Sequence, residues 1–102
     1  MGLEIFGNTG DWAAAYEDYG DHAGFTLAPC PFCGSVDLAL ENTHVPSYWV
    51  ECYGCTAQVH GGRAGGDKKI PSKLKCETLH RQAMRKAVGR WNARFPANGA
   101  AK

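Results

Sequence analysis

Two pairs of closely spaced cysteines constrain the fold of this 102-residue chain more than any other feature. Cys30 and Cys33 lie in the segment CPFCG, and Cys52 and Cys55 lie in the segment CYGC after 18 intervening residues. Two thiolates on one tight turn can face the same ion, and a second such turn completes a tetrahedron with Zn–S distances of about 2.3 Å. This spacing predicts a four-cysteine zinc site in a zinc ribbon.

The turn residues suit a structural metal. Pro31 presets the backbone of the first turn, and Gly34 can adopt the positive φ that lets N–H groups point at sulfur. A catalytic zinc needs an open coordination position, and a redox Cys-x-x-Cys favours a βαβ context that this sequence lacks. Iron can be held by the same four ligands, so the sequence leaves the choice between zinc and iron open.

The remaining candidate ligands are expected to be surplus. Cys76 lies away from both turns and is predicted to be a lone thiol, and His44 and His60 fall in or near loops of the ribbon. His80 falls on the apolar side of a predicted C-terminal helix, so we expect it to be buried and hydrogen-bonded.

Size and composition favour a metal over disulfides. A chain of this length forms one small domain with a modest core, and structural zinc supplies roughly 10–16 kcal/mol of apparent binding free energy in finger peptides. The sequence has no long apolar window and no Lys or Arg before Arg63, so neither a transmembrane helix nor a secretory signal is expected. With an odd number of cysteines, this predicts a cytoplasmic protein.

The net charge of +1 conceals a separation along the chain. Residues 1–62 contain eight acids and neither Lys nor Arg, whereas residues 63–102 contain eleven bases and two acids, so the two parts carry −8 and +9. Either the two parts pair within the molecule, or one of them binds a partner of opposite charge.

Three segments predict the strands of a small antiparallel sheet. Val36, Leu38 and Leu40 alternate with polar or small residues over 36–41, residues 47–52 are rich in aromatic and β-branched side chains, and residues 56–60 form a shorter third segment. The expected fold is therefore small α+β: a zinc ribbon of three antiparallel strands with a four-cysteine zinc at one end.

Residues 77–94 predict an amphipathic C-terminal helix that packs on this sheet. Its apolar arc contains Ala83, Met84, Ala87, Val88, Trp91 and Phe95. Trp91 is the largest expected anchor. Ser72 could cap an earlier start, but the periodicity favours a start near Glu77.

The remaining segments carry turn and linker signals. In residues 1–27, the leader, a short helix is expected over 12–18. Its aromatic residues Trp12, Tyr16 and Tyr19 are expected to fold back onto the ribbon, where the segment either covers a sheet edge or binds a partner. The glycine-dense stretch from Gly61 to Asp67 predicts a flexible connection. The predicted division is 1–27 leader, 28–62 zinc ribbon, 63–75 Gly- and Lys-rich connection, 76–95 helix and 96–102 flexible tail.

Basic side chains near the C-terminal helix form a candidate surface for phosphates or a partner, and Tyr48, Trp49 and Tyr53 near the metal could stack on bases if exposed. The candidates are Lys68, Lys69, Lys73, Lys75, Arg81, Arg85, Lys86, Arg90, Arg94, Tyr48 and Trp49. The alternative is a solvated helix face with ordinary core aromatics. The acidic leader would also repel a polyanion.

No catalytic pattern accompanies these residues. The sequence shows no Ser/His/Asp arrangement or recognisable carboxylate pair, and the glycine pairs at 61–62 and 65–66 lack the context of a phosphate-binding loop. We therefore predict that the protein is not an enzyme.

The combined motifs resemble the restriction alleviation protein Lar family, small zinc-ribbon proteins typical of bacteriophages and prophages. The resemblance covers about residues 28–95 and is carried by CPFCG at 30–34, WVECYGC at 49–55 and AVGRWNAR at 87–94. It implies that the four cysteines are the metal ligands and that Trp91 and Asn92 belong to a helix docked on the ribbon. The chain departs from the family at Thr56, where glycine usually follows the fourth cysteine.

The resemblance also implies a function. Members of the family relieve restriction of incoming DNA by a host type I restriction–modification system. We accordingly expect a non-catalytic accessory protein in the bacterial cytoplasm that binds restriction–modification proteins or another protein complex. The alternative is a nucleic-acid-binding ribbon that uses the basic surface of residues 63–94.

Overall fold

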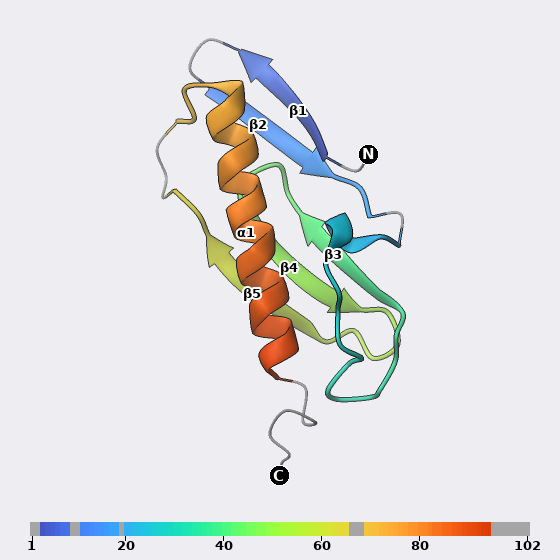
Figure 1. The fold of residues 1–102 in the computed structure, drawn as a ribbon. Helices are drawn as coiled ribbons and strands as arrows, with labels where there is room; N and C mark the ends of the chain where they lie inside the picture. Colours follow the sequence, from blue (N-terminus) through green and yellow to red (C-terminus); the bar gives the residue numbers. More distant parts are fainter. Residues whose placement is uncertain (1–2, 9–10, 19, 66–68, 95–102) are drawn as a thin grey trace.

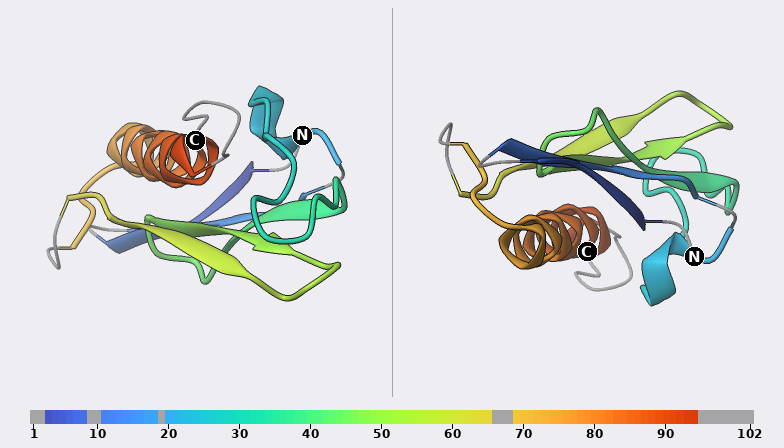
Figure 2. Two further views of the ribbon diagram at one scale, coloured as in Figure 1. Left: turned by 90° about the horizontal axis from the view of Figure 1, so that it is seen from below. Right: turned by 90° about the horizontal axis from the view of Figure 1, so that it is seen from above.

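The protein forms two layers, with one long helix lying across one face of its strands (Figure 1). The computed structural model describes residues 3–8, 11–18, 20–65 and 69–94. In chain order the elements are β1 (Leu3–Asn8), β2 (Asp11–Tyr16), the short 3-10 helix η1 (His22–Gly24), β3 (Leu38–Asn42), β4 (Ser47–Cys52), β5 (Gln58–Arg63) and α1 (Lys73–Ala93). Views from below and above show α1 on one side of the strand layer (Figure 2).

β3, β4 and β5 form the predicted three-stranded antiparallel sheet, with β4 in the centre. β4 has the predicted bounds. The predicted start of β3 was wrong, because Val36 is 76% exposed and precedes the strand. The third strand was also misplaced, since Thr56 has a φ of +66° and belongs to the turn that precedes β5.

α1 begins one turn earlier than predicted. Ser72 caps the helix, because its Oγ accepts a hydrogen bond from the Lys75 N–H at 3.0 Å. The predicted start at Glu77 was wrong because the first turn of the helix lacks a clear apolar stripe: it buries only Cys76 and leaves Leu74 exposed. Apolar periodicity is weak there, and the cap determines the start. Phe95 lies outside the described residues.

The helix packs its apolar face on the sheet, as predicted. Its buried residues are Cys76, Leu79, His80, Ala83, Met84, Ala87, Val88 and Trp91. Trp91 is fully buried, and its ring N–H donates a hydrogen bond to the carbonyl of Ala28 at 2.8 Å. Within the described part of the chain, no helix combines the length and apolar character needed to span a membrane.

His80 is buried and hydrogen-bonded, as the sequence predicted. Its Nδ1 lies 2.9 Å from the hydroxyl oxygen of Tyr48, and the two rings meet edge to face. Burial, assisted by the positive charge of Arg63, lowers the pKa of His80 to about 4. The ring is therefore neutral at neutral pH and belongs to the core.

Gly61 allows the helix to approach β5 closely. A Cβ at Gly61 would lie 2.4 Å from the backbone nitrogen of Ala87, so no larger residue fits without a shift of the backbone. Gly61 and Gly62 are part of β5, which continues to Arg63. The prediction of a flexible connection was therefore wrong for residues 61–63, which belong to β5, and Gly61 serves the close approach of α1 to that strand. Residues 66 and 67 of the predicted connection lie outside the described residues.

The leader contains a β-hairpin where the sequence predicted a short helix over 12–18. β1 and β2 pair in antiparallel register, with Ile5 opposite Ala14. Ala14 and Tyr16 are buried and Trp12 is half-buried. The prediction was wrong because this period-2 burial and the pairing with β1 outweigh the helix propensity of the alanine run. Tyr19 lies outside the described residues.

The hairpin also covers the neighbouring edge of the sheet. The Asp18 carboxylate accepts a hydrogen bond from the Leu40 N–H of β3 at 2.7 Å. The Asn42 side chain bonds the backbone carbonyl of Ala14 at 3.1 Å, and the Ala14 N–H donates to the carbonyl of His44 at 3.1 Å. These contacts satisfy polar groups that an open sheet edge would expose. The leader therefore covers a sheet edge, which was one of the two roles expected for it.

Candidate metal centre

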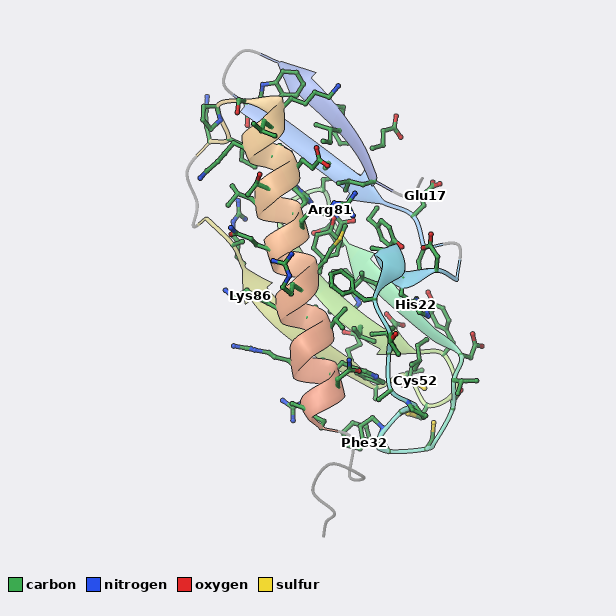
Figure 3. The ribbon with its side chains drawn as sticks, viewed as in Figure 1. Glu17, His22, Phe32, Cys52, Arg81 and Lys86 are labelled. Atoms are coloured by element: carbon green, nitrogen blue, oxygen red, sulfur yellow. The ribbon has the colours of Figure 1, made fainter. Side chains whose placement is uncertain are left out.

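The four cysteines come together at one end of the sheet. Cys30 and Cys33 lie in the loop between η1 and β3, Cys52 ends β4, and Cys55 lies in the turn before β5; Figure 3 labels Cys52 at this end of the molecule. Their four Sγ atoms all lie within 4.8 Å of one another. The Sγ atoms of Cys30 and Cys55 are 3.6 Å apart, and so are those of Cys33 and Cys52.

These distances fit a tetrahedral metal site. Ligands at about 2.3 Å from a zinc ion place their sulfur atoms about 3.8 Å from one another, whereas a disulfide requires an S–S distance of about 2.05 Å. Each close pair takes one cysteine from each turn, so an ion held by all four sulfurs links the two turns. The set of donors is complete for a closed four-coordinate site, and the residues therefore fit a metal ion.

Both turns position their sulfurs with the same backbone hydrogen bonds. The Gly34 N–H donates to the carbonyl of Cys30 at 2.8 Å, and the Thr56 N–H donates to the carbonyl of Cys52 at 2.9 Å. In each turn the N–H two residues after the first cysteine also points at its Sγ, with N···S distances of 3.4 and 3.3 Å. Such N–H groups stabilise a thiolate and orient it toward a metal.

The pKa values of the thiols show that ionisation of one cysteine disfavours ionisation of its neighbours. Burial opposes ionisation of Cys30, but its backbone hydrogen bonds prevail and lower the pKa to about 7. At Cys33 the backbone hydrogen bond of Ser35 lowers the pKa, yet loss of hydration and the neighbouring thiols raise it to about 12. Because four adjacent thiolates repel one another, full ionisation of the set requires a cation between them.

The first turn is tied to the end of α1. The Asn92 side chain accepts a hydrogen bond from the Ala28 N–H and donates one to the carbonyl of Thr26, both at 2.8 Å. Trp91 donates to the carbonyl of Ala28. These contacts explain why a Trp-Asn pair at the end of the helix accompanies the cysteine motif.

The predicted basic surface is accessible over most of its length. Arg81 is half-buried and forms an i,i+4 ion pair with Glu77 at 3.9 Å. Lys68 lies outside the described residues. The exposed members are Lys69, Lys73, Lys75, Arg85, Lys86, Arg90 and Arg94.

Two of the three aromatic candidates, Tyr48 and Trp49, are not exposed as stacking on bases requires. Tyr48 is fully buried against His80 on the face of β4 beneath the helix, so the proposal that it stacks on bases was wrong. Trp49 lies on the opposite face and is half-buried. Its ring stacks on His60 with centroids 5.2 Å apart, and its N–H bonds the Glu51 carboxylate at 3.2 Å.

Sequence reasoning missed two exposed apolar side chains beside the cysteines, Phe32 and Val36, and named a third, Tyr53, only as a ring that could stack on bases. Phe32, Val36 and Tyr53 are 68%, 76% and 52% exposed. A signal existed for Phe32 and Tyr53, because a side chain between two ligands of one tight turn points away from the core. Val36 was instead assigned to a strand.

Comparison with protein families places most of the chain in one of them. The family model described as restriction alleviation protein Lar matches residues 26–95. Searches of curated proteins and of solved structures find no match. The matched span contains both cysteine turns and the helix residues Trp91 and Asn92, whereas the β1–β2 hairpin precedes it.

Proposed function

The chain belongs to the restriction alleviation protein Lar family, and we propose that it is a non-catalytic accessory protein that counters a host restriction–modification system by binding a protein partner. The observation that carries the proposal is the family match over residues 26–95, which spans the cysteine cluster, the sheet and α1. The partner is a restriction–modification protein or a complex that contains one, in the cytoplasm of a bacterial host.

The proposed cofactor is one structural Zn²⁺ held by Cys30, Cys33, Cys52 and Cys55. All four donors are sulfur and all come from this chain, which is the ligand set of structural zinc sites. The ion stabilises the junction of the two turns and supplies no chemistry to a substrate.

Three exposed apolar side chains beside the cysteine cluster support protein binding. Phe32, Val36 and Tyr53 belong to the two turns and the segment beside them, which are joined by the hydrogen bond from the Tyr53 N–H to the carbonyl of Asp37 at 2.9 Å. The Glu41 carboxylate accepts a hydrogen bond from the Tyr53 hydroxyl. Exposed apolar side chains near this carboxylate fit a partner that presents apolar side chains among basic ones.

A restriction assay tests the proposal. Unmodified phage is plated on a restricting strain and on an otherwise identical strain that expresses the protein, which is expected to raise the efficiency of plating. A Phe32→Ala/Val36→Ala variant should lose this effect but keep its metal and its circular dichroism spectrum. The control is Leu74→Ala, because Leu74 is 74% exposed at the opposite end of α1.

The outcomes separate the function from the surface. If the unaltered protein gives no protection in any restricting strain, the proposed function is wrong. If the double variant protects as well as the Leu74→Ala control, the function stands and the partner binds elsewhere.

A second candidate function is nucleic-acid binding through the basic surface of residues 63–94. The exposure of Arg85, Lys86, Arg90 and Arg94 favours it. A gel shift with random DNA and RNA at low salt tests it, and affinity that does not fall steeply as salt rises contradicts contact with phosphates.

A further inference from the structure

A surface cavity lies between the end of β5 and the solvent-facing side of α1. Its volume is about 460 Å³, within the range of small-ligand sites. Its lining residues are Arg63, Ala64, Gly65, Gln82, Arg85 and Lys86. Among the residues that the structure describes, the lining therefore contains three cationic side chains, one amide and no carboxylate.

Two of these cations, Arg85 and Lys86, have no ion-pair partner within the described part of the chain. Arg81, one turn earlier on the helix, instead pairs with Glu77. Cations that face the same cavity repel each other, and an anion between them removes that repulsion. The charge pattern thus favours an anionic ligand.

The walls of the cavity are fixed by the fold. Gln82 and Lys86 are one turn apart on α1, and Arg85 lies beside them. On the other wall, Ala64 is buried and its N–H donates to the carbonyl of Pro46 at 2.9 Å. A Cβ at Gly65 would lie 2.9 Å from the Leu79 side chain, so the backbone there passes close to the helix. The backbone of these walls therefore needs little ordering when a ligand binds.

Four of the acidic side chains gather elsewhere. Glu17, Asp18, Asp37 and Glu41 line a different cavity beside β3 and Tyr53, whereas the basic cavity lies beyond β5, on the other edge of the sheet. Figure 3 shows Lys86 and Glu17 on opposite flanks of the molecule. This separation leaves the field at the basic cavity positive.

We propose that this cavity binds the phosphate of a nucleotide unit, either free or within a nucleic-acid strand. Arg85 offers a planar fork of N–H donors that matches two phosphate oxygens, and Lys86 and Arg63 add positive charge. The Gln82 amide can bond the sugar or a base edge. Since none of the described lining residues is aromatic, the site offers no ring on which a base can stack, and the phosphate dominates recognition. The proposal specifies a site for the second candidate function and is independent of the role against restriction.

The test compares two variants that each remove two positive charges. Arg85→Gln/Lys86→Gln alters the cavity, and Lys73→Gln/Lys75→Gln alters exposed lysines in the first turn of α1, outside the lining. Binding of a fluorescein-labelled single-stranded 12-mer is measured by anisotropy over a salt series. The cavity variant should lose at least about tenfold in affinity and about two units of salt slope, and the control less than about threefold.

Mononucleotide and inorganic phosphate identify the source of the phosphate. Chemical-shift changes at the Gly65 and Gln82 amides on addition of AMP, absent in the cavity variant, assign the site to free nucleotides as well as strands. Shifts only with the oligonucleotide assign it to strands. Equal losses in the two variants, or no shift at these amides with any probe, overturn the proposal whatever the plating assay shows.

Discussion

The two cysteine turns have the same local geometry but are held in place by different parts of the molecule. In each turn the first cysteine is buried and the second is exposed. The first turn is fastened to the end of α1 through Trp91 and Asn92. The second simply joins two paired strands, β4 and β5. Backbone hydrogen bonding therefore shapes each turn, whereas long-range contacts place the first turn against the second.

The turns also differ in the residue that follows the second cysteine. Gly34 has a φ of +79° and Thr56 a φ of +66°, so both positions need the left-handed region. Glycine adopts it without penalty, but a β-branched residue costs roughly 1–2 kcal/mol there. Thr56 stands where members of the family usually have glycine, and the structure explains that preference by the backbone of the turn.

The largest expected effect comes from removing one ligand. Cys52→Ser should lose the metal and most of the stability of the metal end, because bound zinc contributes on the order of 10 kcal/mol to small domains. Metal analysis and near-UV circular dichroism check this result. Cys76→Ser is the control, since Cys76 is buried but lies outside the cluster. Native-like spectra of Cys52→Ser in chelator would contradict a structural metal.

Truncating the helix anchor comes next. Trp91→Ala should cost roughly 3–5 kcal/mol of unfolding free energy, because a fully buried indole and its hydrogen bond to Ala28 are lost. Hydrogen exchange should accelerate more in residues 30–36 than in residues 52–57. Equal acceleration in both turns would show that α1 does not selectively support the first.

Asn92→Ala isolates the polar part of this attachment. It removes hydrogen bonds to Ala28 and Thr26 and should cost about 1–3 kcal/mol in urea unfolding. Arg94→Ala, an exposed change two residues on, should have little effect. Weaker zinc affinity in Asn92→Ala alone would confirm that the attachment orients the first turn, and identical affinities would refute it.

The smallest effects test the residue after each turn. Gly34→Ala should destabilise the zinc-loaded protein by about 1 kcal/mol. No atom lies within 4 Å of the added Cβ, so the cost is conformational. Thr56→Gly should stabilise it by only about 0.5 kcal/mol, because glycine also raises the entropy of the unfolded chain. Both free energies come from urea unfolding, and a loss of stability in Thr56→Gly would mean that Thr56 is not strained.

Features fixed by local chemistry could be predicted from the sequence. The spacing of the four cysteines predicts that their sulfurs come together, because two tight turns suffice to gather them. The apolar stripe of α1 identifies its packing face and Trp91 as an anchor. The family resemblance rests on the same residues and is confirmed by the match to the family.

Features that depend on distant partners could not be predicted. The run around Ala14 has good helix propensity, but pairing with β1 and contact with Asn42 make it a strand. Tyr48 was assigned to a binding surface because no local signal shows which face of β4 the helix covers. Gly61 was interpreted as a linker glycine, although it is the point at which Ala87 meets the sheet.

The most direct test of this account is the metal content of the native protein, purified without added metal and measured by native mass spectrometry with titration of its thiols. A structural zinc held by the four cysteines gives one zinc ion per chain and four thiols that react only after chelation. A metal-free protein with the same fold, whose cysteines react without chelator, would contradict it.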